Sequence, residues 1–329
     1  MLAEATAPQF NMIICSTLLR RAASAAPQRR RTIAYETLDV FTSSRFGGNP
    51  LAVVYDLEQR LTNIDMQHVA AEFGYSETTF VLPPKDPRNT ARVRIFSPTA
   101  EMPFAGHPNV GVATSLAWRG QAFGARIKES VRLEEEAGIV PVEILRFYLD
   151  GMATGAMLTA PEPFSVLEPA LPAAAVAACL GLDAADVDEA RHPPLVATCG
   201  LPFIIANLES LDALGRSRGA PDGFARALAS GDLPEAGPRK VLCYVRGDND
   251  TIRCRMHRSD GSEDAGTGSA NCALVGLLAS LAPDGTASAV ISQGVEMGRP
   301  SELLGDATPT AVRIGGSCAP VMRGELLGW

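Results

Sequence analysis

Two short glycine-containing loops carry the residue types most able to do chemistry. Residues 101–108 read EMPFAGHP, and residues 263–270 read EDAGTGSA. In each loop an acidic residue precedes a glycine, and a run of small or apolar residues follows. The first N–H groups of a helix are unpaired and carry partial positive charge, so a helix that begins at such a loop can bind an anion. Gly106 and Gly268 would let a ligand approach the backbone closely, so two facing loops would hold a small carboxylate.

Four side chains at or near these loops are candidates for acting on such a ligand. His107 begins a predicted helix, whose dipole favours the neutral imidazole and hence a hydrogen-bonding role. A lone histidine before a proline is nevertheless more often a cap or a core residue. Asp264 and Ser269 are, taken alone, most simply capping or turn residues. Glu77 opens a predicted strand, where a glutamate is normally a solvated edge residue.

The hydrophobic pattern predicts a mixed chain of strands and helices around these loops. A helix is expected over residues 62–74, because Thr62 or Asn63 can cap it and Gly74 can end it. Helices are also expected directly after each loop. The predicted strands before residue 160 cover residues 33–42, 51–56, 76–82, 91–98 and much of 131–159. Later, residues 163–191 are predicted to be mostly helical, followed by a buried strand, one or two helices, a strand pair and closing hairpins.

The two loops lie in similar surroundings. Residues 92–95 (RVRI) precede the first loop, and residues 253–256 (RCRM) precede the second. Asn109 and Asn271 each open the following apolar helix. The offset between the two units is 161 residues at the strand and 162 at the helix. This internal similarity predicts two equivalent strand–loop–helix units, although two amphipathic units can also resemble each other by chance.

Composition excludes several classes of protein. The 329 residues are 46% apolar, which suits two globular domains without an apolar run long enough to span a membrane. The net charge is −8, so nucleic acid is an unsuitable partner. The seven cysteines form no C-x-x-C pair and indicate free thiols in a reducing compartment, so we expect a cytoplasmic protein. No P-loop, G-x-G-x-x-G or zinc-ligand pattern is present, so neither a cofactor nor a metal is expected.

The N-terminal segment differs from the rest of the chain. Residues 1–31 contain five arginines and one glutamate. This alanine-rich, acid-poor composition is typical of a transit peptide or a tail, and a start at Met12 is an alternative. We therefore expect residues 1–32 to be a disordered or targeting-like extension outside the fold.

Several stretches together resemble the phenazine-biosynthesis isomerase (PhzF-type) family. They are FTSSRFGGNPLAVV, MQHVAAEFGYSETTFV, RIFSPTAEMPFAGHPNVGVATSLAW, GLPFIIANLESLDAL, EDAGTGSANCALVGLLA and QGVEMGRPSEL, in the family's order from about residue 33 onward. The resemblance implies the diaminopimelate epimerase-like fold, an α+β fold of two pseudo-symmetric domains, each a mixed β-sheet wrapped around a central helix. The expected domains are residues 33–149 and 150–329, with the last strands able to return to the first domain. It also suggests a homodimer.

The resemblance also assigns roles to residues. It implies that Glu77 moves a proton between two carbons of a small unsaturated cyclic carboxylate, of the dihydro-hydroxyanthranilate kind. His107 and Asp264 would position the substrate's polar groups. The substrate-binding residues would be Asn49, Gly106, Gly268 and Ser269, the last three as donors to its carboxylate. Chemically, a partly buried glutamate suits this step, since burial raises the pKa of a carboxyl and its conjugate acid can return the proton.

Two departures from related patterns bear on this interpretation. Racemases and epimerases of the same fold usually carry a cysteine beside each loop glycine, but this chain has Ala105 and Ala265 there, which disfavours an amino or imino acid epimerase. Family members commonly read EDPATGSA, so Ala265 and Gly266 are expected to loosen the second loop. A non-catalytic protein that binds a small anion is a further alternative, and the substrate and pathway stay open.

Overall fold

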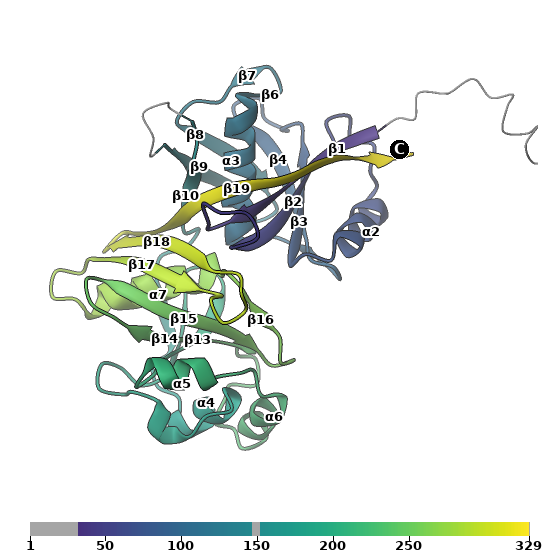
Figure 1. Cartoon of the computed structure of the whole chain (residues 1–329). Coiled ribbons are helices and arrows are strands. Elements are labelled where there is room, and N and C mark those ends of the chain that lie inside the picture. The colour runs from purple at the N-terminus through teal and green to yellow at the C-terminus, as the bar shows by residue number, and fades with distance from the viewer. Residues whose placement is uncertain (1–31, 147–151, 329) are drawn as a thin grey trace, which may run out of the picture.

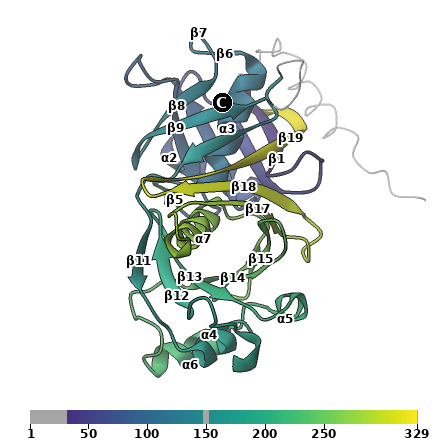
Figure 2. The ribbon, with the colours of Figure 1, turned by 90° about the vertical axis from the view of Figure 1, so that its left-hand side faces the viewer.

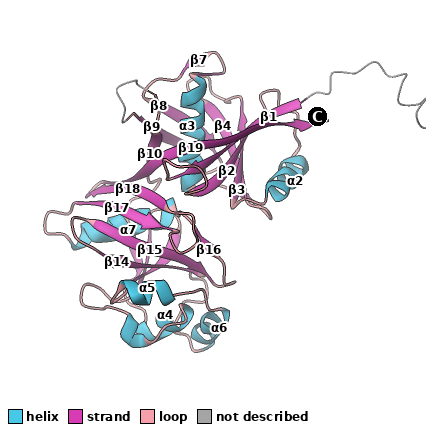
Figure 3. Cartoon of the chain, in the orientation of Figure 1, coloured by secondary structure: helices cyan, strands magenta, loops and turns pink. Residues whose placement is uncertain are grey.

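The computed structural model describes residues 32–146 and 152–328, and the predicted extension lies outside these residues except for Thr32. Figure 1 shows two layers of strands, one around helix α3 (Gly106–Arg119) and one around helix α7 (Gly268–Leu281). Figure 3 shows that strands dominate and that the other helices lie at the periphery. The fold is therefore mixed and dominated by β-sheet, as the α+β prediction requires.

The strands around α3 come mostly from the first half of the chain. They are β1 (Thr32–Val40), β2 (Asn49–Tyr55), β3 (Glu77–Leu82), β4 (Ala91–Phe96), β5 (Glu101–Met102), β8 (Ser130–Glu135), β9 (Gly138–Leu145) and β10 (Gly155–Thr159). β6 (Gln121–Ala122) and β7 (Ala125–Arg126) form a separate small hairpin. β2 and β3 are parallel, as are β4 and β8, whereas β3 and β4 are antiparallel. The parallel pairing of β2 and β3 brings the first residues of both strands to the same edge.

Helix α2 (Asn63–Phe73) connects β2 to β3 and begins and ends as the sequence predicts. Thr62 and Asp65 form a capping box, and Gly74 closes the helix in the left-handed conformation with φ of 63°. Each of these features satisfies backbone groups that a helix terminus leaves unpaired. The prediction for residues 62–74 is confirmed.

The strands around α7 come from the second half of the chain. They are β11 (Ser165–Glu168), β12 (Leu195–Thr198), β13 (Pro202–Asn207), β14 (Lys240–Arg246), β15 (Thr251–Arg258), β16 (Glu263–Asp264), β17 (Ala287–Gln293) and β18 (Ser301–Thr308). Helices α4 (Ala173–Cys179), α5 (Leu211–Arg216) and α6 (Pro221–Ala229) and the 3₁₀ turn η1 (Ala184–Asp186) cover the lower end (Figure 2). β13 and β14 pair in parallel, as do β15 and β17.

The last strand, β19 (Ala311–Leu327), joins the two layers. Its first residues pair with β18, its middle pairs with β10, and its end pairs along the whole of β1. Figure 1 shows it as the yellow strand that passes from the lower layer to the upper one. Strands from both halves thereby belong to one hydrogen-bonded sheet system, and the domain boundary near residue 150 stays a prediction.

The prediction for residues 163–191 is partly wrong. This segment contains the strand β11 and only seven residues of α-helix, in α4. Pro163, Pro169 and Pro172 restrict the backbone before the alanine run, so the helix begins only after Pro172. Residues of β11, before this helix, pair with β12 instead.

The two central helices are buried on all sides. Every residue of α3 from Gly106 to Leu116 is buried, and α7 is nearly as well covered. A helix without a polar face must be enclosed, and the surrounding strands provide this enclosure. Within the described residues, no helix combines the length and hydrophobicity that crossing a membrane would require.

Candidate functional site

The N-termini of α3 and α7 meet at the contact between the two layers. A methyl group placed on Gly106 would lie 3.3 Å from the backbone nitrogen of Ser269 and 3.5 Å from the Cα of Gly268. A side chain at Gly106 would require the start of α7 to shift by a few tenths of an ångström, so glycine favours this close approach. Ala105 and Thr267 occupy the N-cap positions, and neither makes a side-chain capping hydrogen bond. The two helix ends therefore present their first N–H groups to the same region.

Ser269 lies in the first turn of α7, so its interpretation as the helix cap is wrong. The chain adopts the cap conformation at Thr267, two residues earlier. The Thr267 hydroxyl makes no capping hydrogen bond; it donates to the Asp264 carboxylate, 2.5 Å away, and accepts from Gln293 at 3.0 Å. Ser269 lies beside Gly106 instead, a position from which it can donate to a ligand shared by the two helix N-termini.

Glu77 stands at the same junction and faces His107. It is the first residue of β3, and its side chain is 13% exposed, so it is not the solvated edge residue that the local pattern suggests. Glu77 Oε2 lies 3.5 Å from His107 Nδ1. His107 is buried, and among the described residues its Nε2 has no hydrogen-bond partner. Leaving such a group unpaired costs about 1–3 kcal/mol, which is tolerated mainly where the group has a role.

Asp264 is held by a hydrogen-bond network that reaches into the first layer. Asn49 donates from Nδ2 to Asp264 Oδ1 and to the carbonyl of Gly266, both at 2.9 Å. Ser76, the neighbour of Glu77, donates to Asn49 Oδ1 at 3.1 Å. Because β2 and β3 run in parallel, Asn49 and Glu77 lie at the same edge, and all seven predicted site residues come together there.

The second loop is fixed by Gln293, which sequence reasoning missed. Gln293 is fully buried at the end of β17 and donates to the Asp264 carbonyl at 2.8 Å and to the Thr267 hydroxyl at 3.0 Å. It also accepts from the Thr267 N–H at 3.1 Å. A methyl group on Gly266 would lie 2.7 Å from the Ser301 hydroxyl oxygen, so the glycine permits close packing here. Whether the loop is looser than in relatives stays a prediction.

Lys240 is a second residue that the sequence did not indicate. It begins β14, and its ammonium lies over the Phe203 ring at 5.7 Å. Burial and the neighbouring Arg258 lower the pKa of Lys240, while Asp264 and Glu77 oppose this effect. The Lys240 ammonium therefore interacts electrostatically with the carboxylates of both Asp264 and Glu77. The pairing of β14 with β15 places Lys240 opposite Arg258, and β15 in turn pairs with β16, which carries Asp264. No sequence motif marks Lys240.

The cysteines are unsuited to this chemistry. The six cysteines of the described residues are free and buried, and burial raises the pKa of Cys272 well above its usual value. Ala105 and Ala265, not thiols, flank the two glycine loops. A neutral, buried thiol is a poor proton acceptor.

Comparison with known proteins places the chain in a family. Residues 38–324 match the model of the phenazine biosynthesis-like protein family, PhzC–PhzF. The match covers most of the chain, so this protein belongs to the PhzF family, and the resemblance noted in the sequence is confirmed.

Relatives and a solved structure agree with this assignment. An uncharacterized isomerase of Mesorhizobium japonicum is 36% identical over 316 residues, which cover 90% of this chain and 99% of the relative. The trans-2,3-dihydro-3-hydroxyanthranilate isomerase of Pseudomonas aeruginosa is 35% identical, with 85% of this chain and 92% of the relative covered. A PhzF-family phenazine biosynthesis protein of Bacillus anthracis shares the fold, with a TM-score of 0.77, 24% identity and coverage of 90% and 99%. These relatives support an enzyme of the isomerase class.

Proposed function

We propose that this protein is a cofactor-independent isomerase that moves a proton between two carbons of a small unsaturated cyclic carboxylate. The observation that carries the proposal is the meeting of Glu77, His107 and two helix N-termini at one site. A relative 35% identical is named trans-2,3-dihydro-3-hydroxyanthranilate isomerase, and we take a substrate of that kind as the first candidate.

The helix ends are suited to the substrate carboxylate. The N–H groups near Gly106 and Gly268 and the Ser269 hydroxyl lie close together and can donate to one anion. Asp264 has its carboxylate oriented by Asn49 and Thr267, so it can accept a hydrogen bond from an amine or hydroxyl of the substrate. Binding of this kind fixes which carbon faces Glu77.

Glu77 would act as both base and acid. Its carboxylate takes a proton from one carbon, the electron pair moves through the conjugated system, and the same carboxyl returns the proton to another carbon. No atom is gained or lost, and no electron acceptor is required. His107, at 3.5 Å, keeps the Glu77 carboxylate oriented and supports its charge.

Two alternatives remain distinct from this proposal. An epimerase of amino or imino acids would need a pair of opposed bases, and the buried Cys272 is unsuited to that role. A non-catalytic anion-binding protein would bind the carboxylate without turnover. A homodimer stays a proposal based on the family resemblance.

The decisive experiment compares the wild type with Glu77→Gln. Each is incubated with trans-2,3-dihydro-3-hydroxyanthranilate, and absorbance and mass spectrometry follow substrate loss. General acid–base catalysis is worth about 10²–10⁴-fold, and we expect Glu77→Gln to lose at least that much. Glu72→Gln, on the exposed surface of α2, is the matched control and should be fully active.

Each outcome of this experiment has a distinct meaning. Equal turnover by the wild type and Glu77→Gln would eliminate Glu77 as the base. Absence of turnover in the wild type would eliminate this substrate, and α-proton exchange in deuterated water with amino acids would then test the epimerase alternative. Binding of the carboxylate without any exchange would favour the non-catalytic alternative.

A further inference from the structure

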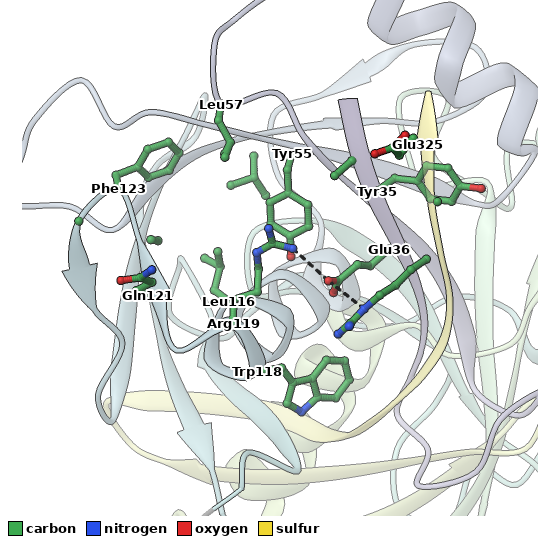
Figure 4. Close-up of a pocket in the computed structure, with 16 residues that line it drawn as sticks. Tyr35, Glu36, Tyr55, Leu57, Leu116, Trp118, Arg119, Gln121, Phe123 and Glu325 are labelled. Carbon is green, nitrogen blue, oxygen red and sulfur yellow. Dashed lines mark hydrogen bonds and ion pairs between the residues drawn. The ribbon is translucent and has the colours of Figure 1, made fainter. Parts of the chain in front are cut away.

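A cavity of about 680 Å³ lies at the end of α3 remote from His107. Figure 4 shows its aromatic side chains, Tyr35, Tyr55, Trp118 and Phe123, around the polar pair Glu36 and Arg119. Pockets for small ligands commonly enclose about 300–1,000 Å³ and combine apolar walls with a few placed polar groups. The size and lining of this cavity match that description, and the candidate isomerase site does not use it.

A chain of hydrogen bonds links Tyr55, Glu36 and Arg119, which line the cavity, through the buried Ser115. Ser115 donates to Glu36 Oε2 at 2.8 Å, so the Tyr55 hydroxyl, 2.5 Å from Ser115, must donate to the serine. Glu36 Oε1 accepts from Arg119 at 3.0 Å and lies 3.4 Å from Arg323 Nε. Glu36 is buried and both of its oxygens accept hydrogen bonds, so this carboxylate does not require a cationic ligand to balance its charge.

Arg119 gives the cavity a planar, positively charged surface. Its guanidinium carbon lies 3.9 Å from the centre of the Tyr55 ring, so one face of the guanidinium covers the tyrosine. A guanidinium has five N–H donors in a flat array that suits a carboxylate or a stacked ring. The lining contains two arginines, Arg119 and Arg323, and two glutamates, Glu36 and Glu325, so its formal charges balance. Glu36 is already paired, whereas the side chain of Arg323 is 75% exposed and can still donate to a ligand.

The rim contains an aromatic residue in a costly conformation. Phe123 lies between β6 and β7 with φ of 47°, followed by Gly124 with φ of 82°. A bulky residue rarely adopts positive φ, and such strain is concentrated at functional positions. Phe123 is 39% exposed and Leu57, across the opening, is 48% exposed. The hairpin thus holds an apolar ring at the mouth of the cavity instead of burying it.

We propose that this cavity is a second ligand site, which binds a planar aromatic carboxylate. The ring would lie between Phe123 and the Arg119 guanidinium, and the carboxylate would accept hydrogen bonds from Arg323. A cationic ligand fits worse, because Arg119 already occupies the face of Tyr55 and neutralises Glu36. The proposal is independent of the isomerase reaction.

The test uses 2-naphthoate with the full-length protein carrying Trp329→Phe, so that Trp118 is the sole tryptophan. We expect naphthoate to quench Trp118 fluorescence and to bind in calorimetry, whereas 2-naphthylmethylamine should bind at least about tenfold more weakly, as the loss of charge-assisted hydrogen bonds predicts. Absence of naphthoate binding, or preference for the amine, would overturn the proposal.

Variants separate this site from the candidate catalytic site. Phe123→Gly should weaken naphthoate binding up to about tenfold through the lost ring contact, with a melting temperature that is unchanged or higher because glycine tolerates the positive φ. Arg119→Lys keeps the charge but removes the planar fork, and it should weaken binding as well. His107→Ala should leave binding unchanged. Binding that survives both cavity variants but is lost in His107→Ala would place the ligand at the other site and refute the inference.

Discussion

The starts of α3 and α7 are built alike, but they carry different side chains. In the first unit Arg94 of β4 pairs with Glu101 of β5, and in the second Arg255 of β15 pairs with Glu263 of β16. Asn109 donates to the Ala105 carbonyl and Asn271 to the Thr267 carbonyl, each four residues back and each at 3.0 Å. These matched contacts support the internal repeat that the sequence suggests.

The difference lies in what each unit presents to the junction. The first unit places His107 directly after its glycine, 3.5 Å from Glu77. The second places Ser269 in the same position and adds Asp264, which Asn49 and Thr267 orient. The comparison teaches that one scaffold can present different polar side chains from its two copies; under the proposed function these would be a partner for Glu77 in the first and a substrate-positioning network in the second.

Within this comparison, the largest expected effect comes from removing the side chains at the matched positions His107 and Ser269. His107→Ala removes the partner of Glu77, and we expect kcat/KM to fall by about 10²-fold. Ser269→Ala removes one hydroxyl donor and leaves the backbone N–H groups in place, so its loss should be smaller, about tenfold or less. Steady-state assays with trans-2,3-dihydro-3-hydroxyanthranilate measure both. A larger loss for Ser269→Ala would break the proposed division of roles.

The two ion pairs provide a stability test of the same comparison. The side chains of Arg255 and Glu263 are 10% and 14% exposed, whereas those of Arg94 and Glu101 are 19% and 32% exposed. Arg255 also donates to the carbonyls of Leu214 and Ser217, which ties the second unit to the region around α5. Breaking a buried pair leaves an uncompensated charge and costs about 3–5 kcal/mol, while an exposed pair is worth about 0–1 kcal/mol.

Urea unfolding of two conservative variants measures this difference. We expect Glu263→Gln to lower the free energy of unfolding by about 3 kcal/mol, because the remaining carbonyl contacts of Arg255 limit the loss. Glu101→Gln should cost about 1 kcal/mol or less. Equal losses of unfolding free energy would show that the two ion pairs contribute equally to stability, which would contradict the prediction from their different burial.

The helix asparagines reveal a third contrast. The Asn271 amide donates to Gln293 Oε1 at 2.8 Å, and Cys254 Sγ lies 3.5 Å from Asn271 Oδ1. In the first unit Glu135 ends β8, as Gln293 ends β17. Among the described residues, Asn109 Oδ1 and both Glu135 oxygens lack a hydrogen bond of normal geometry. Burial raises the pKa of Glu135 to about 8, and the neighbouring Asn109 opposes this rise.

Glu135→Gln converts the first unit to the arrangement of the second. The folded protein holds a proton on Glu135 up to about pH 8, whereas the unfolded chain releases it near its ordinary pKa of 4.5. The stability that this proton contributes is therefore full below pH 4.5 and is lost as the pH rises toward 8. Relative to the variant, wild-type stability should fall by up to about 1.4 kcal/mol per pH unit between these values. Parallel pH profiles for the two proteins would contradict the prediction.

Sequence patterns predict the residues of the candidate site better than the residues around it, such as Gln293 and Lys240. The seven site residues lie in loops or at element starts that family motifs mark, and the structure brings them together. Gln293 opens the family stretch QGVEMGRPSEL, but the motif alone does not reveal its hydrogen bonds to the second loop, and no motif marks Lys240. The alanine-rich segment before residue 191 was misjudged for a related reason, since its prolines and its pairing with β12 outweigh helix propensity.

The smallest expected effect is at Cys272, which decides between the isomerase and a thiol mechanism. Cys272 lies in the first turns of α7, at the place that Val110 occupies in α3. Burial raises the pKa of this thiol, so at neutral pH it holds its proton and cannot accept another. Cys272→Ala should therefore keep turnover within about twofold and lower stability by about 1 kcal/mol through the small cavity. A loss as large as that of His107→Ala would mean that both helices supply reacting groups, and the contrast between a proton-transferring unit and a positioning unit would no longer hold.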